Sequence, residues 1–136
     1  MRSKVYLGLG SNLGDRKENL ACAIRLIGER VGKVLRVSSF IETEPWGFES
    51  DNAFMNAVIL CETDLLPRQL LCVTQKIECE MGRKKKSTDG GYADRCIDID
   101  ILLYDDLRVD EPDLQIPHPL MLKREFVMIP LREIRD

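Results

Sequence analysis

The sequence lacks the features that mark several common classes of protein. It contains one histidine, His118, so a zinc site built from histidine ligands is not expected. Its five cysteines include no Cys-x-x-Cys pair, and such an odd, scattered set predicts reduced thiols in a cytoplasmic protein rather than disulfides. No apolar run reaches the roughly 18 residues that a membrane-spanning helix needs, and the N-terminus has no long apolar segment typical of a signal peptide.

The chain also lacks an excess of positive charge. It has 20 lysine and arginine residues against 23 aspartate and glutamate residues, and the net charge of −3 argues against a general nucleic-acid-binding protein. No internal repeat and no linker divides the 136 residues. Because 44% of them are hydrophobic, residues 1–136 can bury a core of their own, and we expect a single domain.

Two common nucleotide-binding patterns are missing as well. The glycine-rich stretch Gly8-Leu-Gly10-Ser-Asn-Leu-Gly14 is followed by no Gly-Lys-Ser or Gly-Lys-Thr, so it is not a Walker A loop. Its spacing is not Gly-x-Gly-x-x-Gly either. Two interpretations remain, a glycine turn that lets neighbouring segments approach closely and a mobile loop over a ligand. Taken alone, the stretch favours the first.

The chain does contain a strand with two acidic residues. In residues 95–104 apolar and other residues alternate, so Asp98 and Asp100 share one face about 6.5–7 Å apart. Two bare carboxylates at that separation repel each other, and a pair of divalent cations would balance them. An ordinary solvent-facing strand is the alternative. The apolar residues expected on the core face are Ile97, Ile99, Ile101 and Leu103.

The order of predicted elements gives the fold class. A helix capped by Asp15 and a helix capped by Thr63 or Asp64, with Pro67 in its first turn, alternate with strands. The strands are expected at 4–10, 34–43, 53–61 and 95–104, and an amphipathic segment at 126–134 follows. This β-α-β-β-α-β order predicts a ferredoxin-like α+β fold. Both helices would cover one face of an antiparallel sheet, and Asp98 and Asp100 would lie on the uncovered face.

Three further segments carry candidate ligand-binding groups. The loop after residue 43 contains Trp46, which either packs back on the domain or covers a ligand. Asn56 lies among apolar residues and needs a hydrogen-bond partner, by default from the protein. Gln75 and Glu78 are expected together on a side of the second helix away from its inner stripe. The loop at 82–94 is rich in glycine and cations, which suit a polyphosphate beside a metal site.

Several motifs, in this order and spacing, resemble the 6-hydroxymethyl-7,8-dihydropterin pyrophosphokinases of folate biosynthesis. The strand motif Arg95-x-x-Asp98-x-Asp100, followed by Pro117-His118 and Arg124-x-Phe126, is the specific part. The other matching stretches are Gly8 to Gly14, Glu44-Pro-Trp-Gly47, Phe54-Met-Asn-Ala57, Thr74-Gln-Lys-Ile-Glu78, Gly82-Arg83 and Ile116-Pro-His-Pro119.

The resemblance implies a reaction and a set of site residues. ATP would donate pyrophosphate to the pterin hydroxymethyl group and leave as AMP, with two Mg²⁺ on Asp98 and Asp100. Arg83 and Arg95 would join these two residues as catalytic groups. The implied ATP-binding residues are Gln75, Glu78, Arg83, Arg95, Ile101, His118 and Arg124. The implied pterin-binding residues are Thr43, Pro45, Trp46, Phe54, Asn56 and Phe126.

Other functions on the same fold fit the residues less well. An RNA-recognition module needs aromatic side chains on the central strands and a basic sheet face, but the first strand offers only Tyr6. A palm-type nucleotidyltransferase would place an aspartate on the first strand, and residues 4–10 contain none. A regulatory domain would not explain the two aspartates together with the arginines. We therefore expect small-molecule substrates and neither a nucleic-acid nor a membrane partner.

Overall fold

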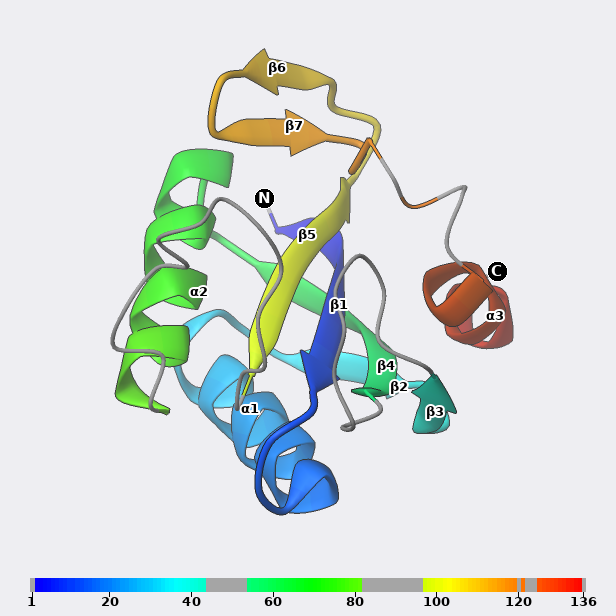
Figure 1. The fold of residues 1–136 in the computed structure, drawn as a ribbon. Helices are drawn as coiled ribbons and strands as arrows, with labels where there is room; N and C mark the ends of the chain where they lie inside the picture. The colour runs from blue at the N-terminus through cyan, green and yellow to red at the C-terminus, as the bar shows by residue number, and fades with distance from the viewer. Residues whose placement is uncertain (1, 44–53, 82–96, 120, 122–124, 136) are drawn as a thin grey trace.

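The computed structural model describes residues 2–43, 54–81, 97–119, 121 and 125–135. Its elements follow one another along the chain as Figure 1 shows. They are β1 (Ser3–Ser11), α1 (Arg16–Arg30), β2 (Val34–Val37), β3 (Ile41–Thr43), β4 (Phe54–Thr63), α2 (Pro67–Glu80), β5 (Asp98–Tyr104), β6 (Val109–Glu111), β7 (Leu114–Ile116) and α3 (Glu125–Ile134).

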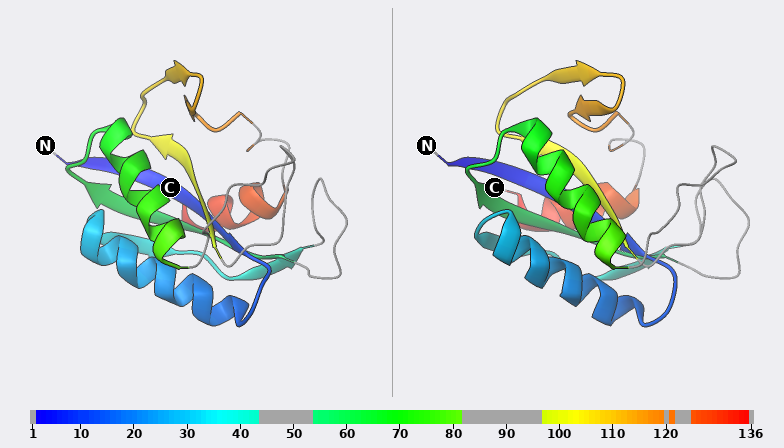
Figure 2. Two further views of the ribbon diagram at one scale, coloured as in Figure 1. Left: turned by 60° about the vertical axis from the view of Figure 1, so that its left-hand side comes forward. Right: turned by 90° about the vertical axis from the view of Figure 1, so that its left-hand side faces the viewer.

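The main sheet is antiparallel, with the strand order β2-β4-β1-β5 and with β3 also paired to β4. Helices α1 and α2 cover one of its faces, which confirms the predicted packing of both helices on one side (Figure 2). The strands β6 and β7 form a separate hairpin beyond the end of β5 (Figure 1). Among the core side chains between the two helices and the sheet are Val5, Leu7, Leu20, Ile27, Ile59, Leu70 and Ile77.

The opposite face of the sheet is partly covered, which corrects the prediction that it stays open. Helix α3 lies across it and buries Val127, Leu131 and Ile134 (Figure 2). Each such side chain contributes about 1.5–3 kcal/mol when it is withdrawn from water. The sheet residues under this helix are Val58, Leu60 and Leu102.

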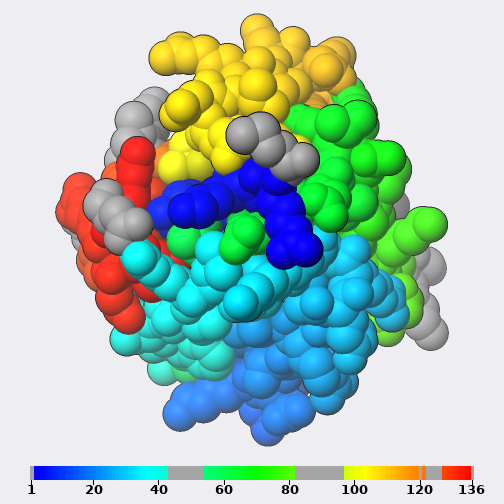
Figure 3. All heavy atoms as spheres, turned by 180° about the vertical axis from the view of Figure 1, so that it is seen from behind, coloured from blue at the N-terminus to red at the C-terminus, as the bar shows by residue number. Residues whose placement is uncertain are grey.

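Helix α3 is also held at the edge of the sheet beside β2. The Arg36 guanidinium donates to the carbonyl of Ile134 at 2.7 Å, and Glu133 accepts from the amide of Ser39 at 2.7 Å. Seen from behind, the red atoms of α3 accordingly adjoin the cyan atoms of the β2 region (Figure 3).

Strand β5 contains a bulge that changes the predicted side-chain pattern. Leu7 pairs with Ile101 and Tyr6 pairs with Leu103, so Leu102 is the extra residue. Ile97, Ile99 and Ile101 face the predicted core. The prediction for Leu103 was wrong, because the bulge turns it toward the α3 side and puts Tyr104 in the core instead.

The predicted strand at 34–43 is two strands. Ser38 interrupts it: the amide of Val58 donates to the Ser38 hydroxyl at 2.8 Å, and the Ser38 amide donates to the Val58 carbonyl at 2.9 Å. A side-chain oxygen thus takes the place of a ladder carbonyl, and β2 and β3 pair with β4 separately.

The predicted N-cap residue of the first helix is confirmed, and that of the second helix, Thr63 or Asp64, is wrong. Asp15 caps α1, because its carboxylate accepts from the Glu18 amide at 3.1 Å. Helix α2 begins later than expected: Leu66 is its N-cap residue, Pro67 is its first residue, and Gln69 accepts from the Leu66 amide at 2.8 Å. In the part of the chain that the structure describes, no helix is both long and apolar enough to cross a membrane.

Candidate active site

The two acidic residues of β5 lie opposite two glycines of the central strand β1. Asp98 pairs with Gly10, and Asp100 pairs with Gly8. On the other side of β1, Gly10 pairs with Asn56 of β4. Cross-strand partners share a face, so Asp98, Gly10 and Asn56 form one row across three strands. The glycines leave the space between the carboxylates and Asn56 free of a β1 side chain.

Gly10 is closely approached from β4. A Cβ atom at this position would lie 3.0 Å from Asn56 Oδ1 and 3.4 Å from the Phe54 ring. Asn56 is buried and Phe54 is half-buried, so their side chains crowd over the glycine. Gly8 and Gly10 lie within a regular strand, and close approach at Gly10, rather than a turn there, explains this glycine.

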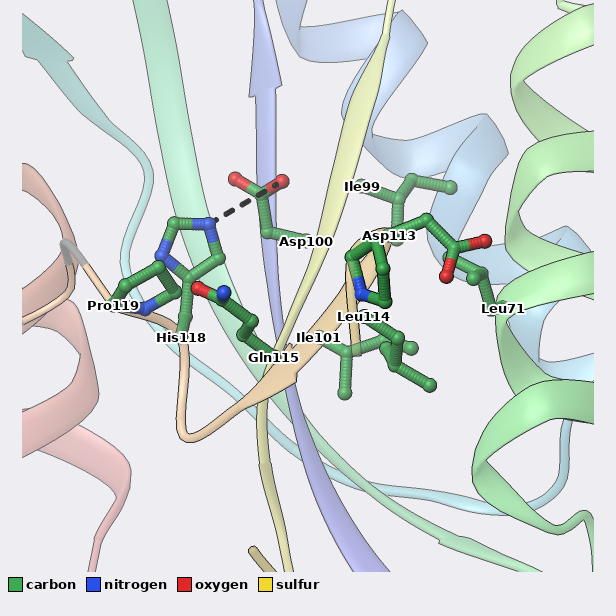
Figure 4. Close-up of a pocket in the computed structure, with 10 residues that line it drawn as sticks. Leu71, Ile99, Asp100, Ile101, Asp113, Leu114, Gln115, His118 and Pro119 are labelled. Carbon is green, nitrogen blue, oxygen red and sulfur yellow. Dashed lines mark ion pairs between the residues drawn. The ribbon is translucent and has the colours of Figure 1, made fainter. Parts of the chain in front are cut away.

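A pocket of about 260 Å³ adjoins Asp100 (Figure 4). It lies between α2, β5 and the β6–β7 hairpin, and at one end His118 Nε2 is 4.0 Å from Asp100 Oδ1. The pocket thus has apolar walls, with the Asp100 carboxylate and the His118 imidazole at one end. Its lining residues are Leu71, Ile99, Asp100, Ile101, Pro112, Asp113, Leu114, Gln115, His118 and Pro119.

The backbone of β5 is held from its outer side by groups of α2 and of the segment after β7. Among the described residues the strand is the last in the sheet order, so no strand of that part of the chain pairs with its outward backbone groups. Glu78 Oε2 accepts from the amide of Ile99 at 2.8 Å, and the amide of His118 donates to the carbonyl of Leu102 at 3.0 Å. These contacts fix the strand that carries both aspartates.

The predicted position of Glu78 was wrong. This residue is buried and belongs to the inner stripe of α2 with Leu70, Thr74 and Ile77, whereas Gln75 is exposed. A buried carboxylate needs a polar partner, and the Ile99 amide at the sheet edge supplies one. Glu78 and Gln75 therefore do not face the same way.

The structure brings part of the predicted site together. Asp100, Ile101 and His118 meet at the pocket, and Asn56 and Phe54 lie across Gly10 from Asp98. Thr43 ends β3, with its backbone paired to that of Phe54, and Phe126 lies in the first turn of α3. Five other predicted site residues lie outside the described part of the chain: Pro45, Trp46, Arg83, Arg95 and Arg124.

The second wall of the pocket was missed from the sequence. Residues 109–116 form a hairpin whose turn contains Pro112 and Asp113. Apolar residues alternate on both sides of this Pro-Asp turn, which is a recognisable hairpin signal. Arg68 of α2 contacts the turn: its guanidinium donates to both carboxylate oxygens of Asp113, at 2.7 and 2.8 Å, and to Glu111. Hydrogen bonds from Arg68 lower the pKa of Asp113.

The donor set suits magnesium better than zinc. No group of three or more His, Cys, Asp or Glu side chains that could hold a metal occurs among the described residues. Mg²⁺ usually needs only one or two carboxylates, with water and substrate phosphates completing its coordination. Asp98 and Asp100 are half-buried and both face the space beside β1, so they fit that pattern.

The chain is similar to known proteins over almost its full length. The family model described as 7,8-dihydro-6-hydroxymethylpterin-pyrophosphokinase (HPPK) matches residues 6–136. A 2-amino-4-hydroxy-6-hydroxymethyldihydropteridine pyrophosphokinase of Porphyromonas gingivalis is 51% identical over 131 residues, with 96% of this chain and 89% of that protein covered. The enzyme of the same name from Aquifex aeolicus is 44% identical, with 96% and 79% covered.

Solved structures agree on the fold. The chain superposes on an HPPK-DHPS of Plasmodium falciparum with a TM-score of 0.76 at 18% identity, covering 98% of this chain and 40% of that one. The chain thus spans about two fifths of that larger protein, and the likeness concerns the fold. The family model and the sequence relatives show that the chain belongs to the 7,8-dihydro-6-hydroxymethylpterin-pyrophosphokinase family.

Proposed function

We propose that this chain transfers pyrophosphate from ATP to the hydroxymethyl group of 6-hydroxymethyl-7,8-dihydropterin, a step of tetrahydrofolate biosynthesis. The products are the pterin diphosphate and AMP. One observation supports the proposal beyond family membership: Asp98 and Asp100 lie between a pocket and a polar and aromatic pair of side chains on β4. The pocket with His118 is on one side, and Asn56 with Phe54 is on the other.

ATP occupies the pocket between α2 and the hairpin in this proposal. Ile99, Ile101 and Leu114 offer apolar surface to a base, and the end near Asp100 and His118 receives the phosphates. Glu78 is also proposed on the ATP side, where its hydrogen bond from the Ile99 amide holds the strand that lines the pocket. The remaining residues proposed on the ATP side are Gln75, Arg83, Arg95 and Arg124.

Asp98 and Asp100 would hold two Mg²⁺. When bound, the ions neutralise the polyphosphate and the developing charge on the leaving group. The two carboxylates provide hard oxygen ligands from neighbouring positions on one face of a fixed strand. Magnesium dependence of this chain is thus part of the proposal.

The pterin lies on the β4 side of the aspartates. A flat heterocycle needs an aromatic face and a hydrogen-bonding edge, which the Phe54 ring and the Asn56 amide offer close together over Gly10. Phe126 supplies the second aromatic face in this proposal. Thr43, Pro45 and Trp46 complete the pocket wall.

The protein's contribution to the reaction is alignment and charge neutralisation. Phosphoryl transfer needs little covalent help, so groups that fix the two substrates in line suffice. The pterin alcohol attacks the middle phosphorus of ATP, and Arg83, Arg95, His118 and Arg124 hold the terminal phosphate that travels with it. No side chain is assigned as a general base.

Three broader assignments accompany this function. We assign the core to the ferredoxin-like arrangement, a choice supported by the antiparallel order β2-β4-β1-β5 and by α1 and α2 on one face. We treat residues 1–136 as one catalytic domain. Cytoplasmic localisation stays a prediction from the odd, scattered set of cysteines.

The test is a product analysis of the purified protein. ATP, Mg²⁺ and the hydroxymethyl pterin are mixed with the enzyme, and nucleotides are separated by chromatography. AMP should appear only when the pterin is present and should match the pterin diphosphate in amount. ADP as the product, or AMP formed equally without the pterin, would contradict the proposal.

A further inference from the structure

Arg68 connects the two walls of the pocket. It stands in the first turn of α2, and both of its terminal nitrogens donate to Asp113, at 2.8 and 2.7 Å. One of them also donates to Glu111. Leu71, one turn further along the same helix, lines one wall of the pocket, and Asp113 lines the other. The guanidinium therefore ties together the two structural elements between which the pocket lies.

The hairpin turn needs such a connection. Leu114 and Ile116 of β7 are anchored in the core, but Glu111, Pro112 and Asp113 are exposed. In the strand pairing of the described residues, β6 and β7 pair with each other and not with the main sheet. The turn is thus exposed although it directly precedes the buried Leu114, and the distance of Glu111 and Asp113 from α2 sets the width of the pocket at this end.

We propose that Arg68 is a positioning residue that holds the Glu111–Asp113 turn against α2 and thereby keeps the nucleotide pocket at its binding width. The inference rests on the proposed function, because it takes the ligand of the pocket to be ATP. A forked guanidinium bound to both oxygens of a carboxylate fixes an angle as well as a distance. Without it, ATP must order the turn when it binds, which weakens affinity without changing the transfer step.

The expected kinetic signature is specific to ATP. Arg68→Gln should raise the KM for ATP by about three- to tenfold, corresponding to the ordering of one or two side chains on binding. The kcat and the KM for the pterin should stay within about twofold of wild type, because the aspartates and the β4 surface are unchanged. Arg68→Lys keeps the positive charge but not the forked geometry of the guanidinium. Its KM for ATP should lie between the values of wild type and Arg68→Gln.

A matched control lies at the other end of α2. Arg30 of α1 binds Glu80 of α2 through both carboxylate oxygens, and both side chains are partly exposed, as in the Arg68 cluster. Neither residue lines the pocket. Arg30→Gln should therefore leave the KM for ATP within about twofold, because this ion pair joins α1 to α2 and does not connect the two walls of the pocket. Thermal unfolding of both variants shows whether the fold is equally affected.

A second variant separates positioning from charge. Loss of Arg68 also leaves the carboxylates of Glu111 and Asp113 without a positive partner near the polyphosphate of ATP. Their repulsion of the phosphates would by itself weaken ATP binding. The triple variant Arg68→Gln, Glu111→Gln, Asp113→Asn removes both carboxylates as well as their hydrogen bonds to Arg68. If Arg68 positions the turn, the triple variant should keep the raised KM for ATP.

The experiment measures steady-state kinetics for wild type and these variants, with titration of a non-hydrolysable ATP analogue as a direct binding measurement. The proposal is overturned by an unchanged ATP affinity in Arg68→Gln, by an equal loss in Arg30→Gln, or by full recovery in the triple variant. Failure of the proposed function is seen separately, because wild type would then form no AMP with the pterin while analogue binding could still be compared.

Discussion

The carboxylate of Glu78 accepts a hydrogen bond of 2.8 Å from the backbone amide of Ile99, the residue between Asp98 and Asp100. Glu78 is buried on α2, and β5 is the end strand of the sheet order. A helix side chain thus does for this strand what a neighbouring strand would otherwise do. The contact sets the position of the backbone from which both proposed metal ligands extend.

Loss of this contact should impair both stability and metal binding. Glu78→Ala leaves the Ile99 amide without its partner, which costs about 1–3 kcal/mol of unfolding free energy. It should also raise the Mg²⁺ concentration needed for half-maximal activity. Glu78→Gln retains an acceptor oxygen and should be affected less. Denaturant unfolding and a magnesium titration check this, with Glu80→Ala on the exposed side of the same helix as control. Equal behaviour of Glu78→Ala and Glu80→Ala would contradict the role of the contact.

The aspartates themselves should matter for activity and not for folding. Asp98→Asn and Asp100→Asn should each lower kcat more than about 10²-fold, as expected for groups that stabilise charge in the transition state. Both side chains are half-buried at the edge of the site, so the unfolding midpoint should hardly change. Kinetics across a range of Mg²⁺ concentrations, with thermal unfolding in parallel, tests this. Near-normal rates at limiting Mg²⁺ would refute the metal assignment.

A side chain at Gly10 should impair pterin binding, because Asn56 and Phe54, which are proposed to bind the pterin, lie directly over this glycine. In Gly10→Ala the new methyl group would meet Asn56 Oδ1 at 3.0 Å, so the amide must shift. The KM for the pterin should rise severalfold or more, whereas the KM for ATP should change less. Separate KM determinations for the two substrates give the answer.

Gly28 provides the control for that substitution. It is an exposed position within α1, where a Cβ would lie 3.8 Å from Val34, an ordinary contact. Gly28→Ala should therefore leave both KM values unchanged and raise stability by about 0.5–1 kcal/mol. If Gly10→Ala and Gly28→Ala show the same pterin KM, the crowding at Gly10 has no functional meaning.

The sequence predicted the acidic strand well but not its end. Alternation correctly gave the faces of Ile97, Ile99 and Ile101, and of the two aspartates between them. It failed at Leu103 because the bulge at Leu102 adds one residue to the strand, and a two-residue period carries no sign of such an insertion.

Tertiary contacts explain the other differences. The three-residue spacing of Gln75 and Glu78 predicted that both lie on a side of α2 away from its inner stripe, but Glu78 is buried in that stripe. Its burial depends on a hydrogen bond from the amide of Ile99, twenty-one residues later in the chain, which no local pattern shows. The pairing of Arg68 with the hairpin turn likewise joins residues 45 positions apart, and it could not be predicted from either segment alone.

The most direct test of the proposed function follows the terminal phosphate of ATP. If the pterin alcohol attacks the middle phosphorus, two phosphates move together and AMP leaves. ATP labelled in its terminal phosphate should then deliver the label to the pterin diphosphate, with an equal amount of unlabelled AMP. ADP together with a singly phosphorylated, labelled pterin, or free labelled phosphate without a pterin product, would contradict the account.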